Sequence, residues 1–313
     1  MTWNNHTTIT EFLLLGFSRL SLELQLVLFG AILLIYITTL IGNIMAIVII
    51  TVDPLLHTPM YWFLKNLSII EICFTTSVAP KMLRDLLSKD KTISFMGCAT
   101  QMIFFFTPGQ NECLLLAVMA YDRYVAICDP LHYTTVMSWY ICIRLMISAW
   151  LTSLLMTLAQ TTFIFSLSYC GPNQINHFFC DVSPMLDLAC EDTSMNKVSI
   201  FVDGIIVLLM PFALILFSYV NILSTILRIR SVEGKRRAFS TCSSHLTSVT
   251  LFYGTAISVY MVSSSQTRDT DKFCSLLYCI VTPMLNPMIY CLRNQEFKKA
   301  FQSFVGKMSN KGL

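Results

Sequence analysis

Ionisable side chains interrupt the long apolar stretches of this chain at only a few positions, and the most informative ones lie near residues 98–121. Glu112 lies within that stretch, and Arg123 follows directly after it. On a helix with about 100° per residue, Phe105, Gly109, Glu112 and Arg123 fall within about 60° of one another. Arg123 would lie about 27 Å along the axis from Phe105. If this stretch is one helix of a membrane-spanning bundle, a single face of it would run from a cavity near the outer end to the cytoplasmic end of the bundle.

A second apolar stretch, residues 59–80, contains the other buried acid, Glu71. Charged groups inside a bilayer are costly and by default indicate function. If Glu71 and Glu112 lie near one another, they cannot both stay ionised without a cation or a shared proton. Two alternatives follow, a cation site or protonated glutamates that are hydrogen-bonded in the core.

The composition indicates what kind of element holds these residues. Of 313 residues, 55% are apolar and 12% are charged, about half the charged fraction of a typical soluble domain. The net charge of +3 is too small and too dispersed to indicate nucleic acid as a partner. No positive region precedes the apolar run at residues 12–17, which is too short for a signal peptide. Of the classes of protein considered, the composition fits a polytopic membrane protein.

Seven stretches are long enough to cross a bilayer as helices. They are residues 24–50, 59–80, 98–121, 145–167, 198–227, 238–262 and 273–292. The sixth is the least apolar, because residues 240–250 are rich in hydroxyls and include His245. This part of the helix should face protein or cytosol, where its polar side chains find partners, and we expect His245 to cap the helix or to face a cytosolic partner. We predict an all-α fold, a seven-transmembrane helix bundle over residues 24–292.

The last residues, 293–313, predict a short amphipathic helix. Phe297, Phe301 and Phe304 recur at i, i+4 and i+7, with Lys298 and Lys299 off that face. Such a helix would lie on the inner leaflet of the membrane lipid.

Loop charges predict the orientation. With residues 293–313 in the cytoplasm, the inner segments carry twelve Lys and Arg and the outer segments carry eight. Residues 1–23 would then be an extracellular tail, in which Asn5 starts an N-glycosylation triplet. Four cysteines could be oxidised on the same side, with three possible connectivities: Cys98, Cys170, Cys180 and Cys190.

Residues 119–128, MAYDRYVAIC, resemble the third-helix signature of odorant receptors, the largest branch of the rhodopsin-like (class A) G-protein-coupled receptors. The resemblance extends over nearly the whole chain. Further matching segments follow in order: Gly42-Asn43, Pro59-Met60-Tyr61, Asn66-Leu67-Ser68, Ser218-Tyr219, residues 235–246 (KRRAFSTCSSHL) and residues 283–294 (PMLNPMIYCLRN). The resemblance implies a multi-pass receptor of the plasma membrane, not an enzyme. Such a receptor binds a small volatile odorant and activates a stimulatory, olfactory-type heterotrimeric G protein, which raises cAMP.

The resemblance also implies roles for single residues. Asp122 would hold Arg123 at rest, and Arg123 would turn toward the G protein on activation. The remaining activation residues would be Tyr124, Tyr219, Asn286, Pro287 and Tyr290. Glu71 and Glu112 would hold a structural sodium ion with Asn286, and no other cofactor is expected. The implied disulfides are Cys98 with Cys180 and Cys170 with Cys190.

The sixth span departs from most rhodopsin-like receptors. It has Phe252-Tyr253-Gly254-Thr255 where they have a Trp and a kinking Pro. The resemblance puts Tyr253 at the switch position. Gly254 is the local weak point, because Gly costs about 1 kcal/mol relative to Ala in a helix.

The odorant pocket is expected among the outer halves of the third, fifth, sixth and seventh spans. Its predicted lining is Met102, Phe105, Phe106, Gly109, Gln110, Asp203, Val207, Tyr253, Ile257 and Tyr260. Gly109 would leave room for the ligand, and Asp203, Gln110 and Tyr260 would be polar anchors. The alternative is that the aromatic residues only pack helix against helix.

Other functions fit less well. A retinal protein needs a Lys in residues 273–292, which contain none. A membrane enzyme needs a nucleophile with its base or a metal cluster at the helix ends. A peptide or amine receptor and a transporter or channel remain as alternatives. The absence of an Asp on the outer half of the third span argues against an amine receptor, and the absence of repeats argues against a transporter.

Overall fold

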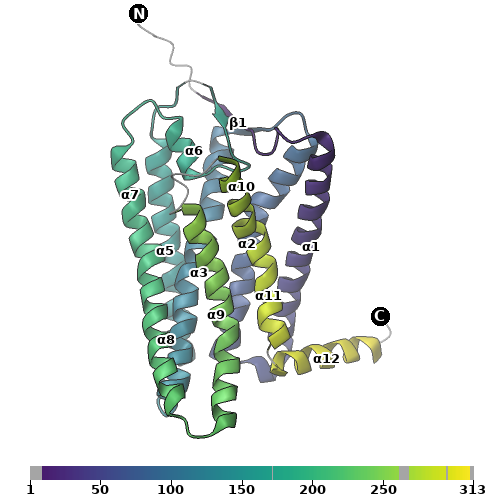
Figure 1. Cartoon of the computed structure of the whole chain (residues 1–313), viewed down its shortest axis with the longest axis vertical. Coiled ribbons are helices and arrows are strands. Elements are labelled where there is room, and N and C mark those ends of the chain that lie inside the picture. The colour runs from purple at the N-terminus through teal and green to yellow at the C-terminus, as the bar shows by residue number, and fades with distance from the viewer. Residues whose placement is uncertain (1–8, 171, 261–267, 294, 311–313) are drawn as a thin grey trace, which may run out of the picture.

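Long helices lie side by side in a bundle in the computed structural model, which describes residues 9–170, 172–260, 268–293 and 295–310 (Figure 1). Uninterrupted α-helices form five of the rods: α1 (Leu22–Val52), α2 (Pro59–Leu87), α3 (Phe95–Cys128), α5 (Trp139–Phe165) and α9 (Val232–Tyr260). The helix α3 is central, because it contacts α2, α5, α8 and α9. It extends beyond the predicted span 98–121 at both ends.

Two further rods are composite, and a proline explains each interruption. One consists of α7 (Ser194–Gly204), a π-helical segment (Ile205–Leu209) and α8 (Met210–Arg228). The other consists of α10 (Arg268–Leu276), a π-helical segment (Leu277–Val281) and α11 (Thr282–Arg293). Pro211 and Pro283 follow these segments, and a proline ring has no N–H and clashes with the carbonyl four residues earlier. Wider π turns accommodate that clash.

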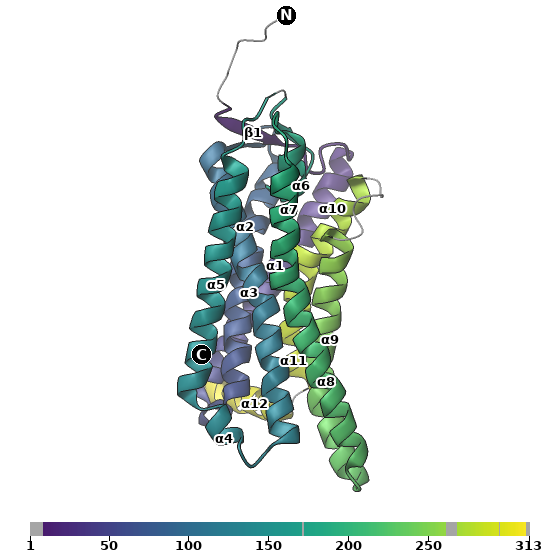
Figure 2. The same cartoon turned by 90° about the vertical axis from the view of Figure 1, so that its left-hand side faces the viewer.

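The bundle is closed at one end by a small sheet, which corrects the all-α expectation. The strands β1 (Glu11–Leu14), β2 (Thr92–Ser94) and β3 (Gln174–Ile175) are ordered β2-β1-β3. β1 runs antiparallel to β2 and parallel to β3. Phe12 and Leu14 alternate toward the core and are buried, which is the period of a strand. We call this the sheet end; Figure 2 shows β1 there, opposite α4 and α12.

The opposite end, which we call the α12 end, holds the short α4 (Tyr133–Val136) and α12 (Gln295–Asn310). Figure 1 shows α12 lying across the axis of the bundle. Phe297 and Ala300 of α12 are buried in the main core, whereas Phe301 is exposed. Among the described residues, two further short helices are η1 (Pro54–Leu56) and, at the sheet end, α6 (Val182–Asp187).

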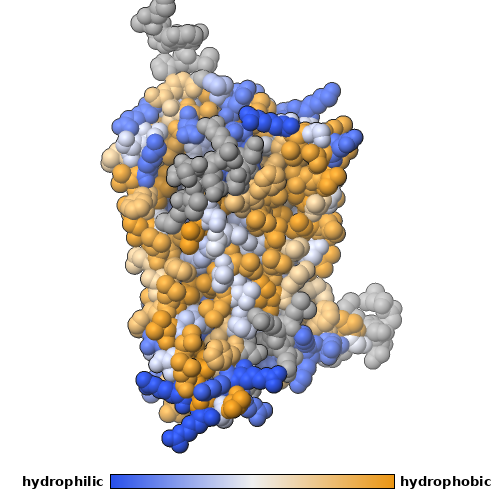
Figure 3. Space-filling model, in the orientation of Figure 1, coloured by the Kyte–Doolittle hydropathy of each residue, from blue (hydrophilic) through white to orange (hydrophobic). Residues whose placement is uncertain are grey.

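The face of the molecule seen in Figure 3 is largely apolar around its middle and more polar at both ends. Side chains such as Leu34 (68% exposed) and Ile41 (60% exposed) point away from the bundle. Within the described residues, five helical segments are long and apolar enough to cross a membrane: α1, α3, α5, Ser194–Arg228 and Asp271–Tyr290. α2 and α9 have 29 residues each but carry more polar side chains.

Candidate functional site

A cluster of two acids and an amide lies in the middle of the bundle. Glu71 of α2, Glu112 of α3 and Asn286 of α11 are all buried. The Asn286 amide Nδ2 donates to Glu71 Oε1 and, at 3.3 Å, to Glu112 Oε1. The second oxygen of Glu71 and the carbonyl oxygen of Asn286 have no hydrogen-bond partner. The structure thus brings together the three residues that the family resemblance associates with sodium.

Oxygen atoms without partners are what a hard cation takes as ligands. Neither Glu71 nor Glu112 forms an ion pair with a Lys or Arg in the described part of the chain. The donor set fits sodium, and it also fits a proton shared between the carboxyl groups. No group of three or more His, Cys, Asp or Glu that could hold a metal occurs among the described residues.

Helix α1 supports the α11 side of this cluster. Pro287 has no N–H, so the carbonyl of Pro283, four residues earlier, lacks its helical donor. The Asn43 amide Nδ2 donates to that carbonyl at 3.4 Å and to Thr39 O at 3.0 Å. A Cβ on Gly42 would lie 3.4 Å from the Pro287 ring, so the two helices approach closely there. Gly42-Asn43 therefore stabilises the break that Pro287 makes in α11.

Arg123 and Asp122 differ from the resting arrangement expected from the resemblance. Arg123 contacts the Met60 sulfur of α2, and no ion pair between Arg123 and Asp122 occurs among the described residues. The Asp122 carboxylate instead accepts a hydrogen bond from the Tyr133 hydroxyl of α4 at 2.8 Å. Burial and the nearby Asp122 raise the pKa of Tyr133 above its usual value. Asp122 therefore fixes the α3–α4 connection while Arg123 is held by a weak sulfur contact.

His245 is fully buried, so the expectation that it caps a helix or faces a cytosolic partner is wrong, whereas this part of the span does face protein, as one of the two expected environments. Its Nε2 lies 3.1 Å from the Leu116 carbonyl, and its Nδ1 lies 2.8 Å from the Tyr219 hydroxyl. Because a carbonyl only accepts, Nε2 carries the hydrogen and Nδ1 accepts from Tyr219. One imidazole thus joins α3, α8 and α9. The hydroxyl-rich face of α9 turns inward, with Ser244 and Ser248 buried beside His245.

The predicted pocket residues whose side chains are described lie in the interior. Met102, Phe105, Gly109, Gln110, Val207 and Tyr253 are buried, and Phe106, Asp203 and Ile257 are partly buried. Tyr253 packs against Phe212 of α8 with ring centroids 4.8 Å apart. Tyr260 ends α9, but its side chain lies outside the described residues, as does Asn5.

Gly109 does not face open space, contrary to the expectation. A Cβ there would lie 3.2 Å from the Phe74 ring and 3.3 Å from the Tyr278 hydroxyl. Phe74 stacks on Phe105 with centroids 4.7 Å apart and meets Tyr278 at 5.1 Å. The glycine thus admits two aromatic rings from α2 and the π-helical segment before α11. Phe74 and Tyr278 are not among the predicted pocket residues, although Phe74 lies three residues after Glu71 and so on the same side of α2.

Three polar side chains connect α5, α3 and α7 at the level of the predicted pocket. Thr157 Oγ1 donates to Gln110 Oε1 at 3.2 Å, and Gln110 Nε2 donates to Asp203 Oδ2 at 3.0 Å. Thr157 and Gln110 are buried, and Asp203 is partly buried. Two of the expected polar anchors therefore contact each other directly.

The sheet end covers this region. Cys98 of α3 is joined to Cys180, and Cys170 is joined to Cys190, which are the pairs implied by the resemblance. Gln101 reinforces the first disulfide, because its Oε1 accepts from the Cys180 amide at 3.0 Å.

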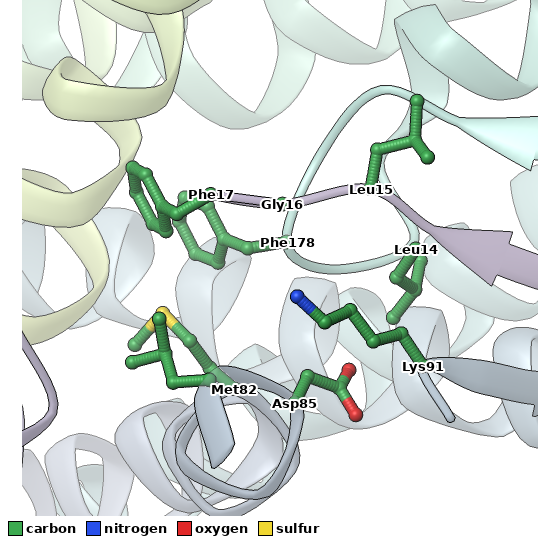
Figure 4. A pocket seen from close by; sticks show the side chains of 9 residues that line it. Leu14, Leu15, Gly16, Phe17, Met82, Asp85, Lys91 and Phe178 are labelled. Atoms are coloured by element: carbon green, nitrogen blue, oxygen red, sulfur yellow. The ribbon is translucent and has the colours of Figure 1, made fainter. Parts of the chain in front are cut away.

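The N-terminal segment is held against this cover by a buried lysine. Lys272 of α10, 3% exposed, donates to Gly16 O at 2.9 Å and to Asn176 Oδ1 at 2.8 Å. Gly16 has a φ of +45°, a conformation that favours glycine. Figure 4 shows the rings of Phe17 and Phe178 side by side over a hollow, and their centroids are 5.5 Å apart.

Two titratable groups are buried in the same cover. Burial lowers the pKa of His177 to about 3, and the positive charge of Lys272 contributes. Burial raises the pKa of Asp181 to about 6, and the negative charge of Asp271 contributes. At neutral pH His177 is therefore uncharged, whereas Asp181 becomes protonated as the pH falls below about 6.

Comparison with known proteins agrees with this architecture. The family model described as "Olfactory receptor" matches residues 32–307. The chain is 51% identical to human "Olfactory receptor 10A4" over 306 residues, 97% of each chain. It is 49% identical to human "Olfactory receptor 10A7" over 301 residues, 96% of this chain and 95% of the relative. It is 47% identical to mouse "Olfactory receptor 5AR1" over 308 residues, 98% of this chain and 99% of the relative. With its apolar membrane-crossing helices and its disulfides, this chain is a multi-pass membrane protein that belongs to the olfactory receptor family.

Proposed function

We propose that the chain binds small volatile molecules among α3, α7, α8, α9 and the α10–α11 rod, and that binding activates a G protein at the α12 end. The partner would be a stimulatory, olfactory-type heterotrimer whose activation raises cAMP. The observation that carries the proposal is the single face of α3, on which Phe105, Glu112 and Arg123 follow one another. A ligand that moves α3 against its neighbours would change the position of Arg123, about 27 Å along the helix axis from Phe105.

The proposed topology has seven spans, with α2 and α9 crossing the membrane beside the five more apolar segments. Residues 1–23 would be extracellular, and α12 would lie on the cytoplasmic leaflet. Glu71 of α2 is compatible with a span because it is buried near Glu112 and Asn286. Glycosidase treatment tests this orientation, because a mobility shift that Asn5→Gln abolishes requires an extracellular N-terminus.

In the proposed resting state, His245 bonds to Tyr219 and Leu116 and so keeps α9 close to α3 and α8. G-protein coupling would require α9 to leave this position and Arg123 to exchange its Met60 contact for the G protein. No covalent bond changes, so a receptor role requires only a shift in population between two arrangements of the helices.

The acid–amide cluster is proposed to hold sodium when the cation is present. Glu71, Glu112 and Asn286 would supply oxygen ligands, and the ion would offset the repulsion between the two carboxylates. Thermal unfolding of the purified protein in sodium chloride and in choline chloride at equal ionic strength tests this. Sodium should raise the melting temperature of the wild type and not that of Glu112→Gln.

The test of the function itself is a cAMP reporter assay against a panel of volatile compounds. Arg123→Ala should keep surface expression and abolish the agonist-driven rise in cAMP. A response equal to that of the wild type would contradict the coupling role of Arg123. A panel without any agonist for a receptor that reaches the surface would count against odorant reception.

A further inference from the structure

The chain of hydrogen bonds through Gln110 has a fixed direction. A carboxylate only accepts, so the Gln110 Nε2 must face Asp203 and its Oε1 must face the Thr157 hydroxyl. Both polar atoms of the buried Gln110 side chain are thereby used. Gln110 uses one of its two amide N–H donors on Asp203, and it thereby holds the Asp203 carboxylate in one orientation.

The second oxygen of that carboxylate is unused. Asp203 Oδ1 is shielded from solvent and has no hydrogen-bond partner. Asp203 forms no ion pair with a Lys, Arg or His in the part of the chain that the structure describes. A shielded carboxylate without a cation is costly, because desolvation penalises its charge.

The preceding turn of α7 contacts a second side chain with an unpaired acceptor oxygen. Ser199 lies four residues before Asp203 on α7, and its hydroxyl and carbonyl accept from Gln160 Nε2 of α5 at 2.8 and 3.1 Å. The Gln160 Oε1 is also shielded and unpaired. Both open positions, Asp203 Oδ1 and Gln160 Oε1, are acceptors. The α5–α7 seam, which we define as Gln110, Thr157, Gln160, Ser199 and Asp203, therefore has only acceptors among its unpaired buried atoms.

The α5–α7 seam lies beside the apolar part of the predicted pocket. Asp203 is four residues before Val207, which is buried in the same core cluster as Tyr253. The π-helical segment Ile205–Leu209 begins directly after Gly204, and such segments occur frequently at functional sites. An apolar ligand tail among the aromatic rings would bring its polar head to Asp203.

We propose that the α5–α7 seam selects ligands by their hydrogen-bond donors, and that a protonated primary or secondary alkylamine is the ligand class that fits it best. This inference rests on the proposed function, because it concerns the pocket of the same receptor. An ammonium group supplies both the missing positive charge and two or three N–H donors to oxygens that only accept. An alcohol supplies one donor without the charge. Aldehydes, ketones, esters and ethers present only acceptors, which would face Asp203 Oδ1 unfavourably.

The experiment uses straight-chain amines, alcohols, aldehydes and methyl ethers of four to ten carbons. Each compound is measured on the full-length receptor by the cAMP dose–response and, with purified protein, by the shift in melting temperature. At each chain length we expect amines to act at lower concentration than alcohols, and aldehydes and ethers to be the weakest.

Two substitutions separate charge from hydrogen bonding. Asp203→Asn keeps an acceptor oxygen but loses the charge, so amine potency should fall by about tenfold or more while alcohol potency changes less. Asp203→Leu removes both, so both classes should lose potency and their thermal shifts. The matched control is Asp192→Asn, which changes an exposed acid in the loop before α7 and should leave every response at the wild-type value.

The two readouts distinguish failure of this inference from failure of the proposed function. If amines raise the melting temperature of the wild type but not that of Asp203→Leu, the inference is supported even when cAMP does not rise. In that case the proposed G-protein coupling would be wrong. The inference is overturned if aldehydes or ethers match the amines, if Asp203→Leu leaves amine responses unchanged, or if neither amines nor alcohols shift the melting temperature. If a water molecule is the natural partner of Asp203 Oδ1, neither amines nor alcohols would shift the melting temperature.

Discussion

The two ends of the bundle are held together by different kinds of contact. At the sheet end, two disulfides, a three-stranded sheet and the buried Lys272 connect the N-terminal segment, α3, α10 and the loop before α7. At the α12 end, the connections are single hydrogen bonds such as Tyr219–His245, and a sulfur contact of Arg123. A disulfide cannot exchange on the time scale of signalling, whereas a hydrogen bond has a net value of about 1 kcal/mol. We therefore expect the sheet end to stay fixed and the α12 end to be the one that rearranges.

Loss of the Cys98–Cys180 disulfide is expected to have the largest effect. This bond closes a loop with a sequence separation of 82, and removal of such a bond typically costs about 2–5 kcal/mol. Cys98→Ser should therefore abolish most surface expression, measured by flow cytometry of an epitope-tagged receptor. The control is Cys73→Ser, which changes a free, exposed cysteine of α2. Normal surface levels of Cys98→Ser would show that the sheet end is not the fixed end.

The buried His177 and Asp181 give the sheet end a pH dependence that two variants should reveal. The folded-state pKa of His177 is about 3 against about 6.5 unfolded, so stability is lost as pH falls below about 6.5. The folded-state pKa of Asp181 is about 6 against about 4 unfolded, so stability is gained as pH falls from about 6 to about 4. Between pH 6 and 4 the two contributions oppose each other with slopes of about 1.4 kcal/mol per pH unit.

The measurement is the difference in thermal stability between each variant and the wild type across this range. Relative to the wild type, His177→Gln should become more stable as pH falls from 6 to 4, and Asp181→Asn should become less stable. If thermal stability changed with pH in the same way for the wild type and both variants, neither His177 nor Asp181 would be shielded from solvent at the sheet end.

The Tyr219–His245 bond tests the α12 end, where the expected energies are smaller. Tyr219→Phe and His245→Leu should each lower stability by about 1–3 kcal/mol, because a buried partner is left unsatisfied. The double variant should lose about 1 kcal/mol less than the sum of the single losses, since both remove one bond. Thermal unfolding of the four proteins gives this coupling energy. If the losses of stability in the two single variants were additive, the bond would not join α8 to α9. The control is Thr250→Val, which changes the exposed face of α9 and should leave the stability unchanged.

The sequence predicts features that depend on one helix better than features that depend on two. The common face of Phe105, Glu112 and Arg123 follows from the helical period alone, and Phe105 and Glu112 are buried as that period requires. The partners of His245 lie on other helices, 26 and 129 residues away, so no local spacing predicts them. Gly109 shows the same limit, because helical geometry indicates the inward face but not which rings fill it.

The N-terminal sheet was missed for a different reason. Four residues of alternating burial in β1 give only a weak strand signal, and their partners lie in β2 and β3, far away in the sequence. The chemistry of the acid–amide cluster was easier to anticipate. Glu71 and Glu112 are ionisable residues inside apolar stretches, which by default indicate function in a membrane. The family resemblance implied Asn286 as their partner.

The smallest expected effect concerns the helix that must move if the α12 end rearranges. A Cβ on Gly254 of α9 would meet nothing within 4 Å, so Gly254→Ala is free of steric cost. Ala should stabilise the folded receptor by about 0.5–1 kcal/mol, because it restricts the unfolded chain and favours helix. If α9 bends at Gly254 during activation, Gly254→Ala should also lower the maximal cAMP response while the melting temperature rises. The same replacement at Gly109, where a Cβ would lie 3.2 Å from Phe74, should lower the melting temperature instead. A higher melting temperature with an unchanged cAMP response would show that α9 moves as one rigid rod, pivoting below the fixed sheet end.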